Sequence, residues 1–144
     1  MNAGDGALVA AARAVRARAH APYSRFRVGA AVRDEAGRVH VGCNVENASY
    51  GLTVCAERHA LAAAVAAGAR AIRAVAVVSG ARPPASPCGA CRQVQAELGD
   101  AGTRVLMAGP RGKVEETTLG ELLPRAFALI SPPRRGRRPR GGGR

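Results

Sequence analysis

Three cysteines stand in patterns that suit a metal site. Cys88 and Cys91 are three residues apart in "SPCGACRQ" (86–93), and Cys55 lies in "TVCAERHA" (53–60). We expect each pattern near the N-terminus of a helix, where backbone N–H groups favour anions and lower the pKa of a thiol. The pair alone could equally be a structural zinc or redox pair. A third thiolate gives a set that zinc binds with its fourth position open, as in catalytic sites.

Glu57 follows Cys55 by two residues, in the same predicted first turn. A carboxylate there can reach water on the metal without ligating the metal itself, as a general acid–base must. Arg58 and two helix N-termini would offset part of the negative charge of zinc with three thiolates. Two alternatives remain: Glu57 could simply complement the helix dipole, and His59, four residues after Cys55, could close a structural Cys3His site.

The elements that position these residues follow from apolar periodicity, turn residues and caps. The predicted helix 86–98 has Ser86 as its cap and Pro87 as its first residue. In chain order we predict a helix at 5–20, a hairpin of 28–32 and 38–44, a helix at 54–67, a strand at 71–79, a helix at 86–98, strands at 103–109 and 113–119, and a helix at 120–130. This order predicts an α/β fold, a three-layer α/β/α sandwich with a five-stranded mixed sheet. The helices at 54–67 and 86–98 flank the central strand, so their N-termini can meet at one sheet edge.

Composition favours a cytoplasmic protein of one domain. The chain has 144 residues and no apolar run near the roughly 20 residues that a membrane span needs. Its N-terminal stretch lacks the order of charge, apolar run and cleavage site that marks a signal peptide. A reducing compartment favours metal binding over disulfides for the four cysteines. The fourth, Cys43, is expected in a strand as a small buried apolar residue.

The basic charge gathers at the C-terminus. The net charge is +12, and residues 132–144 hold six arginines and no acidic residue. We predict a folded domain at 1–131 and a disordered Arg/Gly/Pro-rich tail at 132–144. Such a tail is usually only solvated; weak attraction to RNA or anionic lipid is the alternative.

Several motifs in order resemble the small, zinc-dependent cytidine deaminases that act on free nucleosides. The likeness covers about residues 8–130 through "PYSRFRVGAA" (22–31), "GCNVENASYG" (42–51), "CAERHA" (55–60), "SPCGACRQ" (86–93) and "ELLPRAF" (121–127). It implies one Zn²⁺ per subunit on Cys55, Cys88 and Cys91, Glu57 as the proton shuttle, and a homotetramer. Two positions depart from the family pattern: His59 replaces a small polar residue, and Arg27 stands where proline is common.

The same resemblance implies a set of substrate-binding residues. These are Asn44 and Glu46 on the sugar hydroxyls, Phe26 on the pyrimidine ring, the Ala56 backbone on the base, and Tyr50 and Phe127 near a neighbouring subunit's site. All four aromatic residues, Tyr23 included, fall in or beside these motifs, so the core is expected to be aliphatic.

The resemblance implies hydrolytic deamination of cytidine and 2′-deoxycytidine to uridine and 2′-deoxyuridine, with release of ammonia, in pyrimidine salvage. A deaminase of blasticidin-type antibiotics is one alternative, which the "NVEN" sugar segment disfavours. A nucleic-acid cytosine deaminase would need stacking aromatics, and these are scarce. A non-enzymatic zinc module that binds RNA through its basic tail is the alternative from another class.

Overall fold

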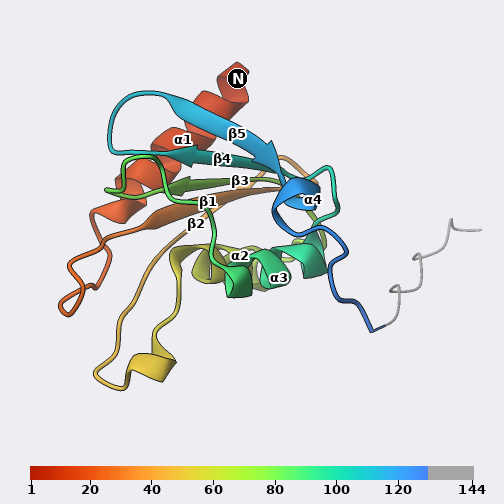
Figure 1. Cartoon of the computed structure of the whole chain (residues 1–144). Coiled ribbons are helices and arrows are strands. Elements are labelled where there is room, and N and C mark those ends of the chain that lie inside the picture. Colours follow the sequence, from red (N-terminus) through yellow and green to blue (C-terminus); the bar gives the residue numbers. More distant parts are fainter. Residues whose placement is uncertain (130–144) are drawn as a thin grey trace, which may run out of the picture.

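The computed structural model describes residues 1–129, which form a sheet with helices on both faces (Figure 1). The elements are α1 (Ala3–Arg16), β1 (Gly29–Asp34), β2 (Val39–Cys43), the 3₁₀ turn η1 (Tyr50–Leu52), α2 (Ala56–Ala66), β3 (Ile72–Val78), α3 (Gly89–Leu98), β4 (Arg104–Ala108), β5 (Val114–Thr118) and α4 (Leu119–Leu122). The sheet order is β2-β1-β3-β4-β5, with β3 and β4 parallel and the other pairs antiparallel. The predicted element order and mixed five-stranded sheet are confirmed.

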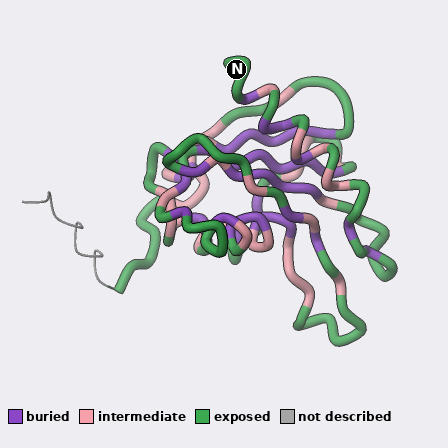
Figure 2. Tube along the Cα trace, turned by 180° about the vertical axis from the view of Figure 1, so that it is seen from behind, coloured by how far each residue is buried: buried purple, intermediate pink, exposed green. Residues whose placement is uncertain are grey.

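The two faces of the sheet bury different side chains, because successive strand residues point to opposite sides. Leu8 of α1 packs with Ala31 of β1 on one face. Leu61 of α2 packs with Val32 and Val75 on the other face, where α3 also lies against α2. Buried stretches therefore follow the strands, while the loops are exposed (Figure 2). The predicted three-layer sandwich is confirmed, and its buried core is aliphatic.

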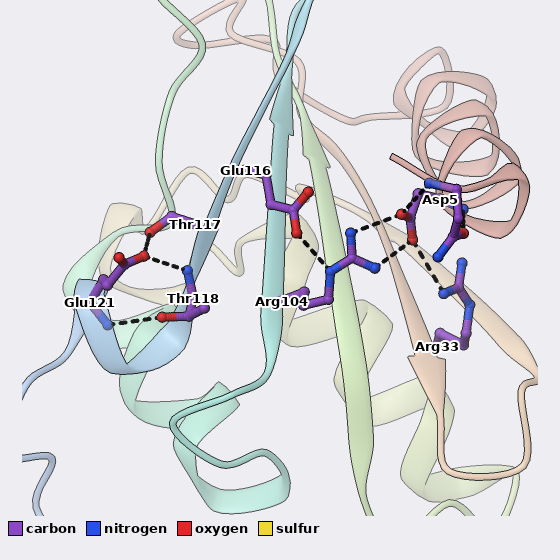
Figure 3. Close-up of polar contacts among 8 residues, drawn as sticks. Asp5, Arg33, Arg104, Glu116, Thr117, Thr118 and Glu121 are labelled. Carbon is purple, nitrogen blue, oxygen red and sulfur yellow. Dashed lines mark hydrogen bonds and ion pairs between the residues drawn. The ribbon is translucent and has the colours of Figure 1, made fainter.

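The first helix begins earlier and ends earlier than the predicted span of 5–20. It starts at Ala3 because Asn2 and Asp5 form a reciprocal capping box, and it ends at Arg16. The fully buried Asp5 also accepts two hydrogen bonds from Arg104 of β4, at 3.0 and 2.8 Å, and lies 3.4 Å from Arg33 of β1 (Figure 3). The Arg104 contact lowers the pKa of Asp5 to about 2. This ionised carboxylate ties the start of α1 to two strands.

The predicted start of α3 is wrong by two residues. Cys88 is the N-cap and Gly89 the first helical residue, whereas Ser86 and Pro87 precede the helix. The Ser86 hydroxyl is engaged elsewhere, since it accepts a hydrogen bond from Arg92 at 3.0 Å. Both cysteines of the motif therefore stay at the start of the helix, Cys88 as the N-cap and Cys91 in the first turn.

The predicted helix at 120–130 is also wrong in extent, because α4 has only four residues. Thr118 and Glu121 cap its start (Figure 3). It stops because Leu123 precedes Pro124, and the proline ring disfavours helical backbone at the residue before it. Residue 130, the predicted domain boundary after 131 and the tail at 132–144 lie outside the described residues. Within residues 1–129, no helix combines the length and apolar character needed to cross a bilayer.

Candidate active site

The three predicted ligands meet where α2 and α3 begin. Cys55 is the N-cap of α2, Cys88 is the N-cap of α3, and Cys91 lies in the first turn of α3. Their Sγ atoms all lie within 4.8 Å of one another, and those of Cys55 and Cys88 are 3.9 Å apart. Thiolates that share one tetrahedral zinc with bonds of about 2.3 Å are separated by about 3.8 Å. Within residues 1–129 this is the one cluster of three or more potential ligands, and it fits zinc.

The charges of the thiols favour a cation among them. The contact with Cys91 lowers the pKa of Cys55 to about 5, and nearby Arg58 acts in the same direction. The same contact, together with burial, raises the pKa of Cys91. Arg58 donates to the carbonyl of Thr53 at 3.2 Å, while its buried Nε has no hydrogen-bond partner among residues 1–129. A bound cation would therefore let the buried thiol ionise, with release of its proton.

Glu57 is a buried carboxyl group beside this cluster. Only 4% of the residue is exposed, and this burial raises the pKa of its carboxyl, with the charge of Cys55 adding to the effect. A carboxyl in this state can hold a proton closer to neutral pH than an exposed glutamate does. Glu57 can thus both accept and return a proton, which a helix-capping charge need not do.

Most of the predicted site residues line one cavity of about 180 Å³. Its lining includes Phe26, Asn44, Cys55, Ala56, Glu57 and Cys88. The Asn44 side chain is held in this lining by two hydrogen bonds: its Nδ2 donates to the carbonyl of Phe26 and its Oδ1 accepts from the N–H of Val28, both at 2.8 Å. One cavity thus brings together a carboxyl group, two thiols of the cluster, an aromatic ring and an amide.

Glu46 and Tyr50 line a different cavity, of about 270 Å³. The Glu46 carboxylate accepts hydrogen bonds from the N–H groups of Tyr23 and Ser24, at 2.9 and 3.1 Å, and from the Ser24 hydroxyl. The Ser24 hydroxyl lowers the pKa of Glu46. Tyr50 meets Tyr23 edge to face, with ring centroids 5.6 Å apart. The single chain therefore does not bring Glu46 into the cavity of Asn44, although the two are close in sequence.

Phe127 lies outside both cavities. Its residue is 69% exposed, and its carbonyl accepts a hydrogen bond from Gln93 of α3 at 3.1 Å. The segment that carries Phe127 is thus held to the helix that contains Cys91, while most of Phe127 itself is exposed to solvent.

Sequence reasoning missed Thr53, which lines both cavities. Its place two residues before Cys55 was the available signal. The alternative of a structural Cys3His site is not supported, because His59 is not part of the thiol cluster. Its Nδ1 instead lies 2.8 Å from the carbonyl oxygen of Cys43. Cys43 itself is half-buried rather than fully buried.

Comparisons with known proteins agree with this geometry. Residues 4–107 match the family model described as "Cytidine and deoxycytidylate deaminase zinc-binding region". The chain is 47% identical over 121 residues to a protein of Sporosarcina psychrophila named cytidine deaminase, covering 84% of this chain and 89% of that protein. It is 54% identical over 109 residues to the cytidine deaminase of Halalkalibacterium halodurans, covering 76% and 83%. The crystal structure of cytidine deaminase from Burkholderia pseudomallei superposes with a TM-score of 0.82 at 52% identity, covering 88% of this chain and all of that one. The chain therefore belongs to the cytidine and deoxycytidylate deaminase zinc-binding family.

Proposed function

We propose that this protein hydrolyses cytidine and 2′-deoxycytidine to uridine and 2′-deoxyuridine, with release of ammonia. The observation that carries the proposal is a cluster of three thiols, two of which, Cys55 and Cys88, line one cavity together with the buried Glu57, Phe26 and Asn44. The relatives named cytidine deaminase support the same substrate class.

Cys55, Cys88 and Cys91 would hold zinc, which when bound acts as a Lewis acid that makes water nucleophilic near neutral pH. Two of these ligands stand at helix N-caps, where unpaired backbone N–H groups stabilise negative charge. Arg58 adds a positive charge to the same place, which limits the loss of Lewis acidity that three thiolates would otherwise cause.

Glu57 moves the protons. It takes one from the attacking water and delivers it to ring N3, which makes C4 electrophilic. The water oxygen bonds to C4 as a hydroxyl, and Glu57 then carries the remaining proton of that hydroxyl to the exocyclic amine. The C4–N bond breaks, ammonia leaves, and C4 becomes the carbonyl carbon of uridine. Burial suits Glu57 to this work, because the raised pKa brings proton uptake and release closer to the operating pH.

The cavity wall would orient the substrate. Phe26 would pack on the pyrimidine ring, and the backbone of Ala56 would bind the base. Thr53 lines both cavities, so a nucleoside whose base lies beside Glu57 can extend its sugar toward Glu46. We assign the sugar hydroxyls to Asn44 and Glu46 on this ground, since an amide and a carboxylate together satisfy a hydroxyl's donor and acceptor.

The enzyme is proposed to act as a homotetramer in cytoplasmic pyrimidine salvage. The loop around η1 projects from the body of the molecule (Figure 1), and its Tyr50 and Leu52 are 73% and 65% exposed. Together with the exposed Phe127, these side chains suit packing against neighbouring subunits, where Tyr50 and Phe127 would approach another subunit's cavity. Four free thiols suit a reducing compartment.

A substrate panel tests the function. Zinc-loaded protein is incubated with cytidine, 2′-deoxycytidine, a blasticidin-type aminoacyl nucleoside and a short single-stranded oligonucleotide, and the ammonia released is measured. We expect one ammonia per uridine or deoxyuridine formed from the first two and little from the others. Ammonia from the oligonucleotide or the antibiotic alone would contradict the proposal.

A further inference from the structure

His59 makes a contact that has no role in the chemistry described above. It lies in α2, two residues after Glu57, and is half-buried. The nitrogen Nδ1 faces the carbonyl oxygen of Cys43 at 2.8 Å. Because a carbonyl only accepts, Nδ1 must carry the hydrogen and donate it. The ring thus bonds the end of strand β2 and stays out of the thiol cluster.

Helix α2 and strand β2 approach each other very closely at this place. A Cβ added to Gly42 would lie 2.4 Å from the nitrogen of Ala60, 2.7 Å from the carbonyl oxygen of Ala56 and 2.8 Å from Cβ of His59. The absence of a side chain at Gly42 lets the two elements pack this closely, but such contact does not by itself stop one from sliding along the other. The hydrogen bond from His59 is directional and supplies that restraint.

The strand end that His59 holds leads directly into the cavity wall. Asn44 follows Cys43, and its amide binds the carbonyl of Phe26 and the N–H of Val28. Asn44 and Phe26 line the same cavity as Glu57. A continuous path of contacts therefore runs from α2, through His59 and the Cys43 carbonyl, to Asn44 and Phe26 in the cavity lining.

We propose that His59 is a positioning residue that sets the Asn44–Phe26 wall against the helix carrying Cys55 and Glu57. Only the kinetic test of this inference rests on the proposed function. His59 neither binds zinc nor moves a substrate proton. Its loss weakens substrate binding, because the wall is no longer held at the right separation, while the groups that carry out the reaction stay in place.

Two matched variants test this role. His59→Leu removes the donor, whereas His59→Asn, of similar shape, keeps an N–H close to the position of Nδ1. We expect the KM for cytidine to rise about 3- to 10-fold in the leucine variant, the loss of one typical hydrogen bond, with kcat within about 3-fold of wild type. The asparagine variant should recover a KM within about 2-fold of wild type, and both should keep wild-type zinc content.

A second readout needs no substrate. The Val28 N–H donates a hydrogen bond to Oδ1 of Asn44. Hydrogen exchange of this amide should be several-fold faster in His59→Leu and near wild type in His59→Asn. If the leucine variant does not fold, His59→Gln replaces it, because the longer glutamine side chain places its N–H beyond the position from which Nδ1 reaches the Cys43 carbonyl oxygen.

Three results would overturn the inference: unchanged KM and Val28 exchange in His59→Leu, no recovery in His59→Asn, or loss of zinc from His59→Leu, which would make the histidine a ligand. If the wild-type protein leaves cytidine unchanged, the proposed function fails, and Val28 exchange still decides the role of His59.

Discussion

Substitution of Gly42 by alanine tests how closely the fold couples to the site. The new Cβ would meet the backbone of α2 at 2.4 Å, whereas ordinary contact begins at about 3.4 Å. Since backbone cannot rotate aside as a side chain does, helix and strand must separate by about 1 Å. Overpacking of this kind costs about 1–3 kcal/mol. For a chain of this size, we expect Tm to fall by roughly 3–12 °C.

The same shift should impair the reaction, because the displaced turn carries Cys55 and Glu57. A misplacement of about 1 Å can cost about 100-fold, so kcat/KM for cytidine should fall about 10- to 100-fold. Gly6→Ala is the matched control, since a Cβ there meets nothing within 4 Å in helix α1. That variant should gain about 0.5–1 kcal/mol through the better helix propensity of alanine. Scanning calorimetry and cytidine kinetics on both variants provide the measurements. A Gly42→Ala protein with wild-type Tm and kcat/KM would refute the close helix–strand contact.

Three further predictions concern the metal, the acid stability and the C-terminal segment. Cys88→Ala should lose zinc and unfold at lower temperature, because the metal ties two helix starts together, whereas Cys43→Ala should keep zinc; full zinc content in Cys88→Ala would contradict the assignment. The pKa of Asp5 falls from 3.8 unfolded to about 2 folded, so its ionisation stabilises the fold fully above about pH 4, and this contribution is lost as pH falls toward 2. The difference in unfolding free energy between wild type and Asp5→Asn should therefore shrink across that window, and a difference that stays constant with pH would refute it. Deleting residues 132–144 should leave cytidine turnover nearly unchanged while Phe127→Ala lowers it, since a nucleoside has no phosphate for the arginines to attract; equal effects of the two changes would contradict this.

The sequence predicted the metal site well because its determinants are local. Residues three apart, such as Cys88 and Cys91, stay on one side of the helix start even if the helix begins a residue or two later than predicted. The wrong predicted start of α3 therefore did not affect their convergence with Cys55. The order of elements then sufficed to place both helix N-termini at one edge of the central strand.

The substrate side depended on contacts that spacing does not encode. The resemblance placed Asn44 and Glu46 together on the sugar hydroxyls, but in the single chain Glu46 accepts a hydrogen bond from Ser24 and lines another cavity. The border position of Thr53 arises from the path of the loop before α2, which no periodicity describes. The short α4 followed from Pro124, whose effect on the preceding residue outweighed the helix-forming composition of the segment.

The most direct test of the account compares wild type with Glu57→Gln at equal zinc content, following the loss of ultraviolet absorbance as cytidine becomes uridine. Glutamine keeps the size of the side chain and removes its ability to carry protons. We predict that the wild-type protein deaminates cytidine, and that Glu57→Gln retains zinc and the fold but is at least about 100-fold slower, as expected for the loss of a proton carrier. A Glu57→Gln protein within tenfold of the wild-type rate, or a zinc-loaded wild type that leaves cytidine unchanged, would contradict the central claim.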